Sequence, residues 1–111
     1  KARFNIRQKI FPSCYRLYDN WFETSRNQEN EDIRPGDLVV VYTSKEQTPH
    51  YGNHITIART SPDKDGNFHT TEGNAHGVGP DQTWREGVVK RTRNLEDVAH
   101  VYRLIDEDYE D

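Results

Sequence analysis

Four residues of this chain have side chains that could carry out hydrolytic chemistry together: Cys14, His54, Glu72 and Asn74. A cysteine attacks a carbonyl carbon as a thiolate, and it needs a base, most often histidine, that takes its proton. A carboxylate or amide bound to the second ring nitrogen holds that histidine in the required tautomer. These residue types therefore predict a thiol hydrolase site, provided that the fold brings them together.

Cys14 is predicted to lie at the beginning of a helix. Pro12 ends the segment before it, and Ser13 is a good N-cap because its hydroxyl accepts a free backbone N–H. Free N–H groups and the helix dipole stabilise a thiolate there, and the N–H of Cys14 is a natural oxyanion donor. The alternative is a small buried hydrophobe, since Cys14 shares a helical stripe with Leu17 and Trp21. Taken alone, Cys14 fits this alternative better.

His54 begins one predicted strand, and Glu72 ends the next. An Asp-Gly turn signal joins the two strands as a hairpin, so the two side chains can be cross-strand neighbours. Glu72 or Asn74 would then orient His54, although a plain Gly-Asn turn at a strand end is the simpler interpretation. His69 is a poorer partner for Glu72 because their odd spacing places them on opposite faces of the strand.

The elements that must position these residues are one helix and about five strands. The apolar stripe predicts a helix that ends near Thr24 or Arg26, and a polar loop follows over 27–32. A β-branched run over 38–42 predicts a strand that is buried on both faces. Further strands are predicted over 53–60, 68–72, 88–93 and 98–105. This order predicts an α+β fold, with the N-terminal helix packed on an antiparallel sheet.

The length of 111 residues predicts one domain, which we place at residues 1–105. Residues 106–111 are acidic, and we expect them to form a solvated, frayed tail. The stretch from Lys1 to Lys9 fits either an edge strand or the end of an incoming segment. The chain begins at Lys1 and contains no methionine, so we expect a processed chain or a piece of a longer one.

Composition and spacing count against several classes of protein and site. The net charge is -4 and the basic residues are interspersed with acids, which does not fit a nucleic-acid surface. One cysteine cannot form an internal disulfide, and no apolar run approaches the roughly 20 residues of a membrane span. Scattered histidines do not support a zinc site. Residues 63–67 fit a turn better than a calcium loop. An EF-hand loop needs glycine at its sixth position and glutamate at its twelfth, whereas here the glycine is fourth and the twelfth residue is Asn74. No cofactor is predicted.

Together these residues resemble the CHAP amidases (cysteine, histidine-dependent amidohydrolase/peptidase), a papain-like family that cuts bacterial peptidoglycan. The shared pattern is a cysteine at a helix start, Pro-Gly-Asp before an apolar strand, His-Ile-Thr-Ile-Ala, and Glu-Gly-Asn, over roughly residues 10–105. The resemblance implies a papain-like fold in which Cys14 is the nucleophile, His54 is the base, and Glu72 and Asn74 orient the base. It also implies the peptide stem of peptidoglycan as substrate, at the bacterial cell wall.

Two other functions remain open at this point. The link from Cys14 to Pro-Gly-Asp is shorter than the family pattern, and Tyr-Arg-Leu-Tyr follows the cysteine where Ala or Thr and an aromatic are common. This departure motivates a non-catalytic binding or structural module on the same fold. A papain-like deamidase or protease that acts on a protein partner is the third interpretation.

Trp84, Tyr51 and Gly73 are predicted to contact the substrate.

Overall fold

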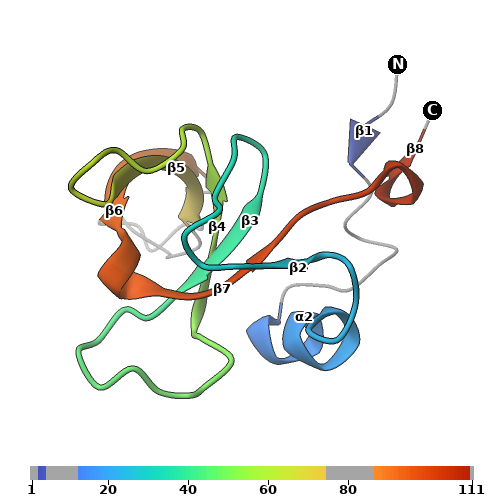
Figure 1. Ribbon diagram of the computed structural model, residues 1–111, viewed down its shortest axis with the longest axis horizontal. Helices are drawn as coiled ribbons and strands as arrows, with labels where there is room; N and C mark the ends of the chain where they lie inside the picture. The colour runs from blue at the N-terminus through green and yellow to red at the C-terminus, as the bar shows by residue number, and fades with distance from the viewer. Residues whose placement is uncertain (1–2, 5–12, 75–86, 111) are drawn as a thin grey trace, which may run out of the picture.

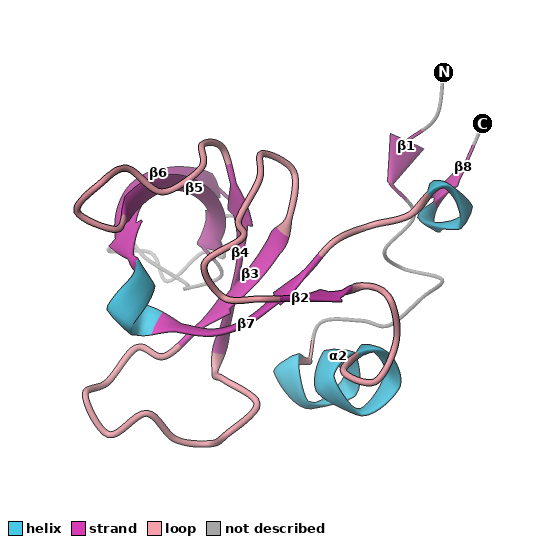
Figure 2. Cartoon of the chain, viewed as in Figure 1, coloured by secondary structure: helices cyan, strands magenta, loops and turns pink. Residues whose placement is uncertain are grey.

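The computed structural model describes residues 3–4, 13–74 and 87–110, which form an α+β fold (Figure 1 and Figure 2). The helices and strands of these residues are β1 (Arg3–Phe4), α2 (Cys14–Trp21), β2 (Asn27–Gln28), β3 (Leu38–Val41), β4 (His54–Ala58), β5 (Asn67–Asn74), β6 (Gly87–Asn94), a 3-10 helix (Leu95–Asp97), β7 (Val98–Tyr102), a second 3-10 helix (Asp106–Asp108) and β8 (Tyr109–Glu110). Six strands form one antiparallel sheet in the order β2-β7-β3-β4-β5-β6, and β1 pairs with β8.

The main sheet has six strands where the sequence predicted about five. The additional strand is β2, which pairs with Tyr102 and Val101 of β7 at the edge of the sheet. The polar sequence over 27–32 predicts a loop here, which the structure corrects. The two residues of β2, Asn27 and Gln28, are polar and too few to show an alternating pattern, so hydrophobic periodicity cannot detect such a strand.

Helix α2 begins as predicted and ends earlier. The hydroxyl of Ser13 accepts the backbone N–H of Arg16 at 3.3 Å, which is the predicted N-cap contact. The helix ends at Trp21, because Thr24 donates both its backbone N–H and its hydroxyl to the Trp21 carbonyl, at 3.1 and 2.7 Å. In the described part of the chain, no helix is long and apolar enough to cross a membrane.

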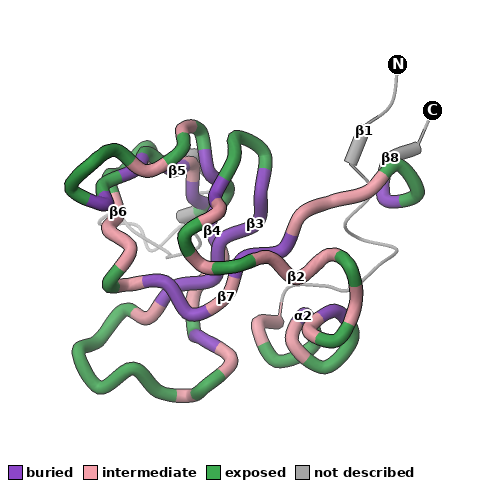
Figure 3. Tube along the Cα trace, in the orientation of Figure 1, coloured by how far each residue is buried: buried purple, intermediate pink, exposed green. Residues whose placement is uncertain are grey.

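Strand β3 is buried on both faces, as its β-branched run predicted. Because neighbouring residues of a strand point to opposite faces, β3 separates two hydrophobic clusters. Val40 belongs to the cluster that includes Leu17 of α2, which we call the helix-side cluster. Val39 belongs to the cluster that includes Phe68 of β5, which we call the hairpin-side cluster. The buried trace along β3 and β7 is visible in Figure 3.

The connection between β4 and β5 is the predicted hairpin turn. The carboxylate of Asp63 accepts the backbone N–H groups of Asp65 and Asn67 at 2.9 and 3.0 Å. Gly66 has φ +87°, a left-handed conformation that glycine adopts without strain. The carboxylate of Asp63 therefore stabilises the turn, and the turn places β5 beside β4.

The acidic run at the C-terminal end is part of the fold, which corrects the expectation of a solvated tail. Asp108 is fully buried, and its two carboxylate oxygens accept hydrogen bonds from the Arg26 guanidinium, both at 3.0 Å. The next two residues form β8, which pairs with β1 at the other end of the chain. Local charge density cannot show a partner that lies 82 positions away in the sequence.

Candidate functional site

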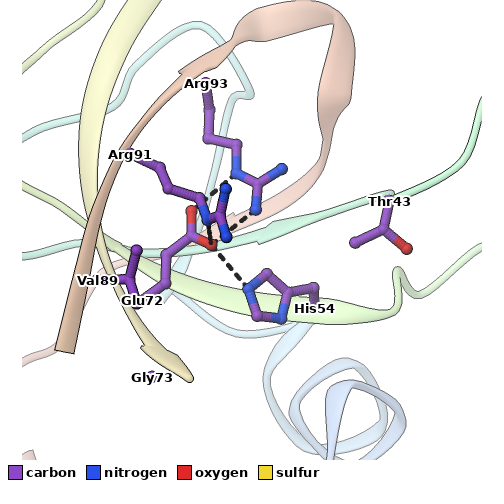
Figure 4. Close-up of a pocket in the computed structure, with 7 residues that line it drawn as sticks. All are labelled: Thr43, His54, Glu72, Gly73, Val89, Arg91 and Arg93. Atoms are coloured by element: carbon purple, nitrogen blue, oxygen red, sulfur yellow. Dashed lines mark hydrogen bonds and ion pairs between the residues drawn. The ribbon is translucent and has the colours of Figure 1, made fainter. Parts of the chain in front are cut away.

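The hairpin of β4 and β5 brings two of the predicted site residues into contact. His54 is the first residue of β4, and Glu72 lies near the end of β5. Nε2 of His54 lies 2.9 Å from Oε1 of Glu72 (Figure 4). The expectation that these two side chains are cross-strand neighbours is confirmed. His69, which strand alternation made a poorer partner for Glu72, instead contacts the hydroxyl of Thr92.

The carboxylate of Glu72 is buried and surrounded by hydrogen-bond donors. Arg93 binds both of its oxygens, at 2.6 and 2.7 Å, and the hydroxyl of Thr70 donates to Oε2 at 2.7 Å. Burial by itself would raise the pKa of Glu72, but the bonds from Arg93, Thr70 and His54, with the charge of Arg93, outweigh it and lower the pKa to about 2. Glu72 is therefore ionised at neutral pH.

An ionised Glu72 determines which nitrogen of a neutral His54 carries the proton. A carboxylate can only accept hydrogen bonds, so the facing nitrogen, Nε2, must donate. The lone pair of a neutral His54 ring then lies on Nδ1, which is turned away from Glu72 in Figure 4. The side chain of His54 is 30% exposed, so part of it is accessible to solvent. A neutral His54 in this tautomer can therefore accept a proton at Nδ1.

A pocket of about 200 Å³ opens beside this pair. Its lining residues come from β4, β5, β6 and the segment after β3, and are Thr43, His54, Glu72, Gly73, Val89, Arg91 and Arg93. The register of β5 and β6 pairs Glu72 with Val89 and Thr70 with Arg91, so their side chains share one face of the sheet. The pocket therefore combines a carboxylate, an imidazole and two guanidinium groups.

The two arginines of the pocket were not among the predicted site residues. The signal was present in the predicted strand over 88–93, because strand alternation places Val89, Arg91 and Arg93 on one face. Two positive charges on the same face of one strand need a negative partner or solvent. Glu72, already predicted to face His54, was the available partner.

Cys14 lies on the other face of the sheet from His54. Its side chain packs against the helix-side cluster, together with Ile55. His54 precedes Ile55 in β4 and pairs with Val41, which belongs to the hairpin-side cluster. Consecutive strand residues point to opposite faces, so β3 and β4 separate the thiol from the imidazole. The described residues contain no hydrogen bond between Cys14 and His54.

The environment of Cys14 disfavours the thiolate. Burial raises the pKa of its thiol to about 11, and the hydrogen bond from its own backbone N–H lowers it by less. The thiol is therefore protonated at neutral pH. The first turn of α2 provides the expected N–H groups, but burial against apolar side chains has the larger effect on the pKa of the thiol.

The other predicted site residues fall in different places. Gly73 lines the pocket. Tyr51 lies against α2, with its ring 5.3 Å from that of Tyr15, and does not line the pocket. Asn74 is the last residue of β5 and pairs with Gly87. Trp84 lies outside the described residues. In the described part of the chain, no group of three or more His, Cys, Asp or Glu side chains could hold a metal ion.

Comparisons of the chain with protein-family models, curated proteins and solved structures found no match. The resemblance to CHAP amidases therefore rests on the sequence motifs around Cys14, His54 and Glu72.

Proposed function

We propose that the pocket around His54 is the base centre of an amide hydrolase of the CHAP type. The observation that carries the proposal is the contact of 2.9 Å between His54 Nε2 and Glu72 Oε1. It fixes the tautomer in which Nδ1 is the proton acceptor. Glu72 acts as a positioning residue, and Arg93 holds it in place through two hydrogen bonds.

In this proposal, Nδ1 of His54 takes the proton of the attacking thiol, which the resemblance to CHAP amidases assigns to Cys14, the one cysteine of the chain. The sulfur forms a bond to the amide carbon, the C–N bond breaks, and the imidazolium gives its proton to the leaving amine. Water then hydrolyses the thioester and regenerates the thiol. Ionised Glu72 stabilises the imidazolium between these steps. The resemblance to CHAP amidases supplies the substrate class, which is the peptide stem of bacterial peptidoglycan.

Replacement of His54 by alanine tests the base. We expect the release of new amino groups from purified peptidoglycan to fall by about a hundredfold or more, since this is the usual contribution of a general base. His69→Ala is the matched control, because His69 lies on β5 and its ring contacts Thr92 rather than Glu72. Equal amine release by the wild type and His54→Ala would contradict the proposal.

The sequence assigns the attacking thiol to Cys14, and the arrangement of the two faces counts against that assignment. With a thiol pKa of about 11, alkylation of Cys14 by iodoacetamide should be slow at neutral pH. Its rate should rise about tenfold per pH unit between about pH 7 and pH 10, because the thiolate fraction rises with pH. Mass spectrometry of the labelled chain measures this rate. Fast labelling at neutral pH, with little dependence on pH, would instead identify Cys14 as an activated nucleophile.

The position of Cys14 favours a second candidate function, a non-catalytic binding module on the same fold. Cys14→Ala separates the possibilities in the amine-release assay. Loss of amine release in Cys14→Ala, with the fold unchanged, supports Cys14 as the nucleophile. Retained release that still depends on His54 supports the base centre with another nucleophile. No release by the wild type, with binding of peptidoglycan fragments, supports the binding module.

A further inference from the structure

We infer that the pocket beside His54 binds the free carboxylate of a peptide, and that Arg91 is the residue that binds it. The peptide nature of the ligand rests on the proposed function. The carboxylate follows independently from the charges and hydrogen bonds of the pocket.

The first observation is that the acceptor positions of Glu72 are occupied. Its two oxygens receive two bonds from Arg93, one from His54 and one from Thr70. Arg91 lies farther away, with Nε 3.6 Å from Oε1 of Glu72, which is an ion pair without a hydrogen bond. Within the described part of the chain, the Arg91 guanidinium has no hydrogen-bond acceptor, and its side chain is 56% exposed.

The second observation is the charge balance of the pocket. Among the residues that line the pocket, Arg91 and Arg93 carry two positive charges and Glu72 carries one negative charge, so one positive charge of the lining is unmatched when His54 is neutral. Asp97, which does not line the pocket, also attracts Arg93 but, among the described residues, is not paired with Arg91. This local surplus occurs in a chain whose net charge is -4. A ligand with one negative charge would complete the balance. A dianionic phosphate would instead leave a negative charge beside Glu72, so a carboxylate fits better.

The third observation is the geometry of the free group. A guanidinium presents parallel N–H donors that match the two oxygens of a carboxylate. The pocket holds about 200 Å³, less than the roughly 300–1,000 Å³ of sites for drug-sized ligands. It therefore accommodates the end group of a peptide rather than a long segment of it.

Arg91 and His54 approach the same oxygen of Glu72, at 3.6 and 2.9 Å. A carboxylate bound to Arg91 would therefore hold the adjoining amide close to the His54 ring. The ligand class is a peptide that carries a free carboxylate next to the amide that is presented to His54. For a hydrolase, this selects substrates by the charge beside the scissile bond.

The test compares two probe peptides that differ only in this charge, N-acetyl-alanyl-alanine and its C-terminal amide. Their dissociation constants are measured at low ionic strength from the NMR shifts of the Thr43 and Gly73 backbone amides, which line the pocket. We expect the carboxylate to bind about tenfold more tightly than the amide, as charge-assisted hydrogen bonds allow. Arg91→Gln should remove this preference. Equal affinities on the wild type, or a preference that survives in Arg91→Gln, would overturn the inference.

Lys90→Gln is the matched control, because Lys90 is exposed and lies next to Arg91 on the opposite face of β6. Lys90→Gln removes one positive charge, as Arg91→Gln does, and it should keep the preference for the carboxylate probe. Loss of the preference in Lys90→Gln would show a nonspecific effect of net charge and contradict the inference. Inorganic phosphate that competes better than acetate would contradict the choice of a carboxylate. His54→Ala separates this inference from the proposed function, because binding of the carboxylate should survive where turnover is lost.

Discussion

Replacement of Glu72 by glutamine is expected to lower the free energy of unfolding by about 3–5 kcal/mol, as for other broken buried ion pairs. Glu72 is only 3% exposed and accepts both hydrogen bonds of Arg93. Glutamine keeps the shape but removes the negative charge, and its amide group places donors against the donors of Arg93. The charges of Arg93 and Arg91 then repel each other across the pocket. Urea unfolding of the two proteins measures the difference.

Acid provides a second measurement on the same carboxylate. The pKa of Glu72 is about 2 in the folded chain and about 4.5 without its partners. A lowered folded-state pKa stabilises the fold above the unfolded-state value, and this contribution disappears as the pH falls. The difference in unfolding free energy between wild type and Glu72→Gln should therefore shrink by about 3 kcal/mol from pH 5 to pH 2.

The control for both measurements is Glu96→Gln. Glu96 is exposed on the 3-10 helix Leu95–Asp97, and the change should alter the free energy of unfolding by no more than about 0.5 kcal/mol. A gap between wild type and Glu72→Gln that stays constant across the acid range would show that the carboxylate of Glu72 is not the titrating group. An equally small effect of both variants would show that the ion pair does not stabilise the fold.

Replacement of Asp37 by alanine is the second change with a large expected effect, about 3–5 kcal/mol in the free energy of unfolding. Asp37 is 2% exposed and follows the Pro-Gly turn that leads into β3. Its carboxylate accepts two hydrogen bonds from Arg103, at 3.0 and 2.9 Å, and one from the backbone N–H of Arg34. Alanine removes the buried carboxylate that Arg103 hydrogen-bonds, and it removes the side-chain acceptor of the Arg34 N–H.

Asp32→Ala is the matched control for Asp37→Ala. The carboxylate of Asp32 also lies near Arg103, but at 3.6 Å, and this side chain is 42% exposed. Alanine keeps the backbone carbonyl of residue 32, which accepts a hydrogen bond from Arg103 at 2.9 Å. Solvent screens an exposed ion pair, so the effect on stability should be much smaller than that of Asp37→Ala. Thermal or urea unfolding of both variants gives the comparison. Similar losses for the two aspartates would contradict the role assigned to the buried pair.

Local patterns were sufficient to predict most of the main sheet. The β-branched run at Leu38–Val41 and the alternation at His54–Ala58 are periodic signals, and both became strands. Two residues of polar sequence at Asn27–Gln28 carry no such signal, and they pair with β7 through backbone groups that every residue has. The buried bond between Arg26 and Asp108 joins residues far apart in the sequence, so composition described Asp108 only as acidic.

The candidate site was predictable where one hairpin determines it. His54 and Glu72 lie on the two strands of a hairpin whose turn the sequence identifies, so strand pairing predicted their contact. The position of Cys14 relative to His54 depends on which face of the sheet α2 covers, and no short-range pattern specifies that face. Arg91 and Arg93 belong to a strand whose register with β5 sets their distance from Glu72.

The pairing of β1 with β8 has a consequence for the connectivity of the chain. Arg3 and Glu110 are paired in this two-stranded sheet, and Figure 1 shows β1 and β8 side by side. A short linker could therefore connect β8 to β1, since the entropy of closing a loop grows only slowly with its length. The exposed segment of residues 44–48, between β3 and β4, is a suitable place for new ends. The fold is thus suited to circular permutation, with its residues in a new order and the pocket unchanged.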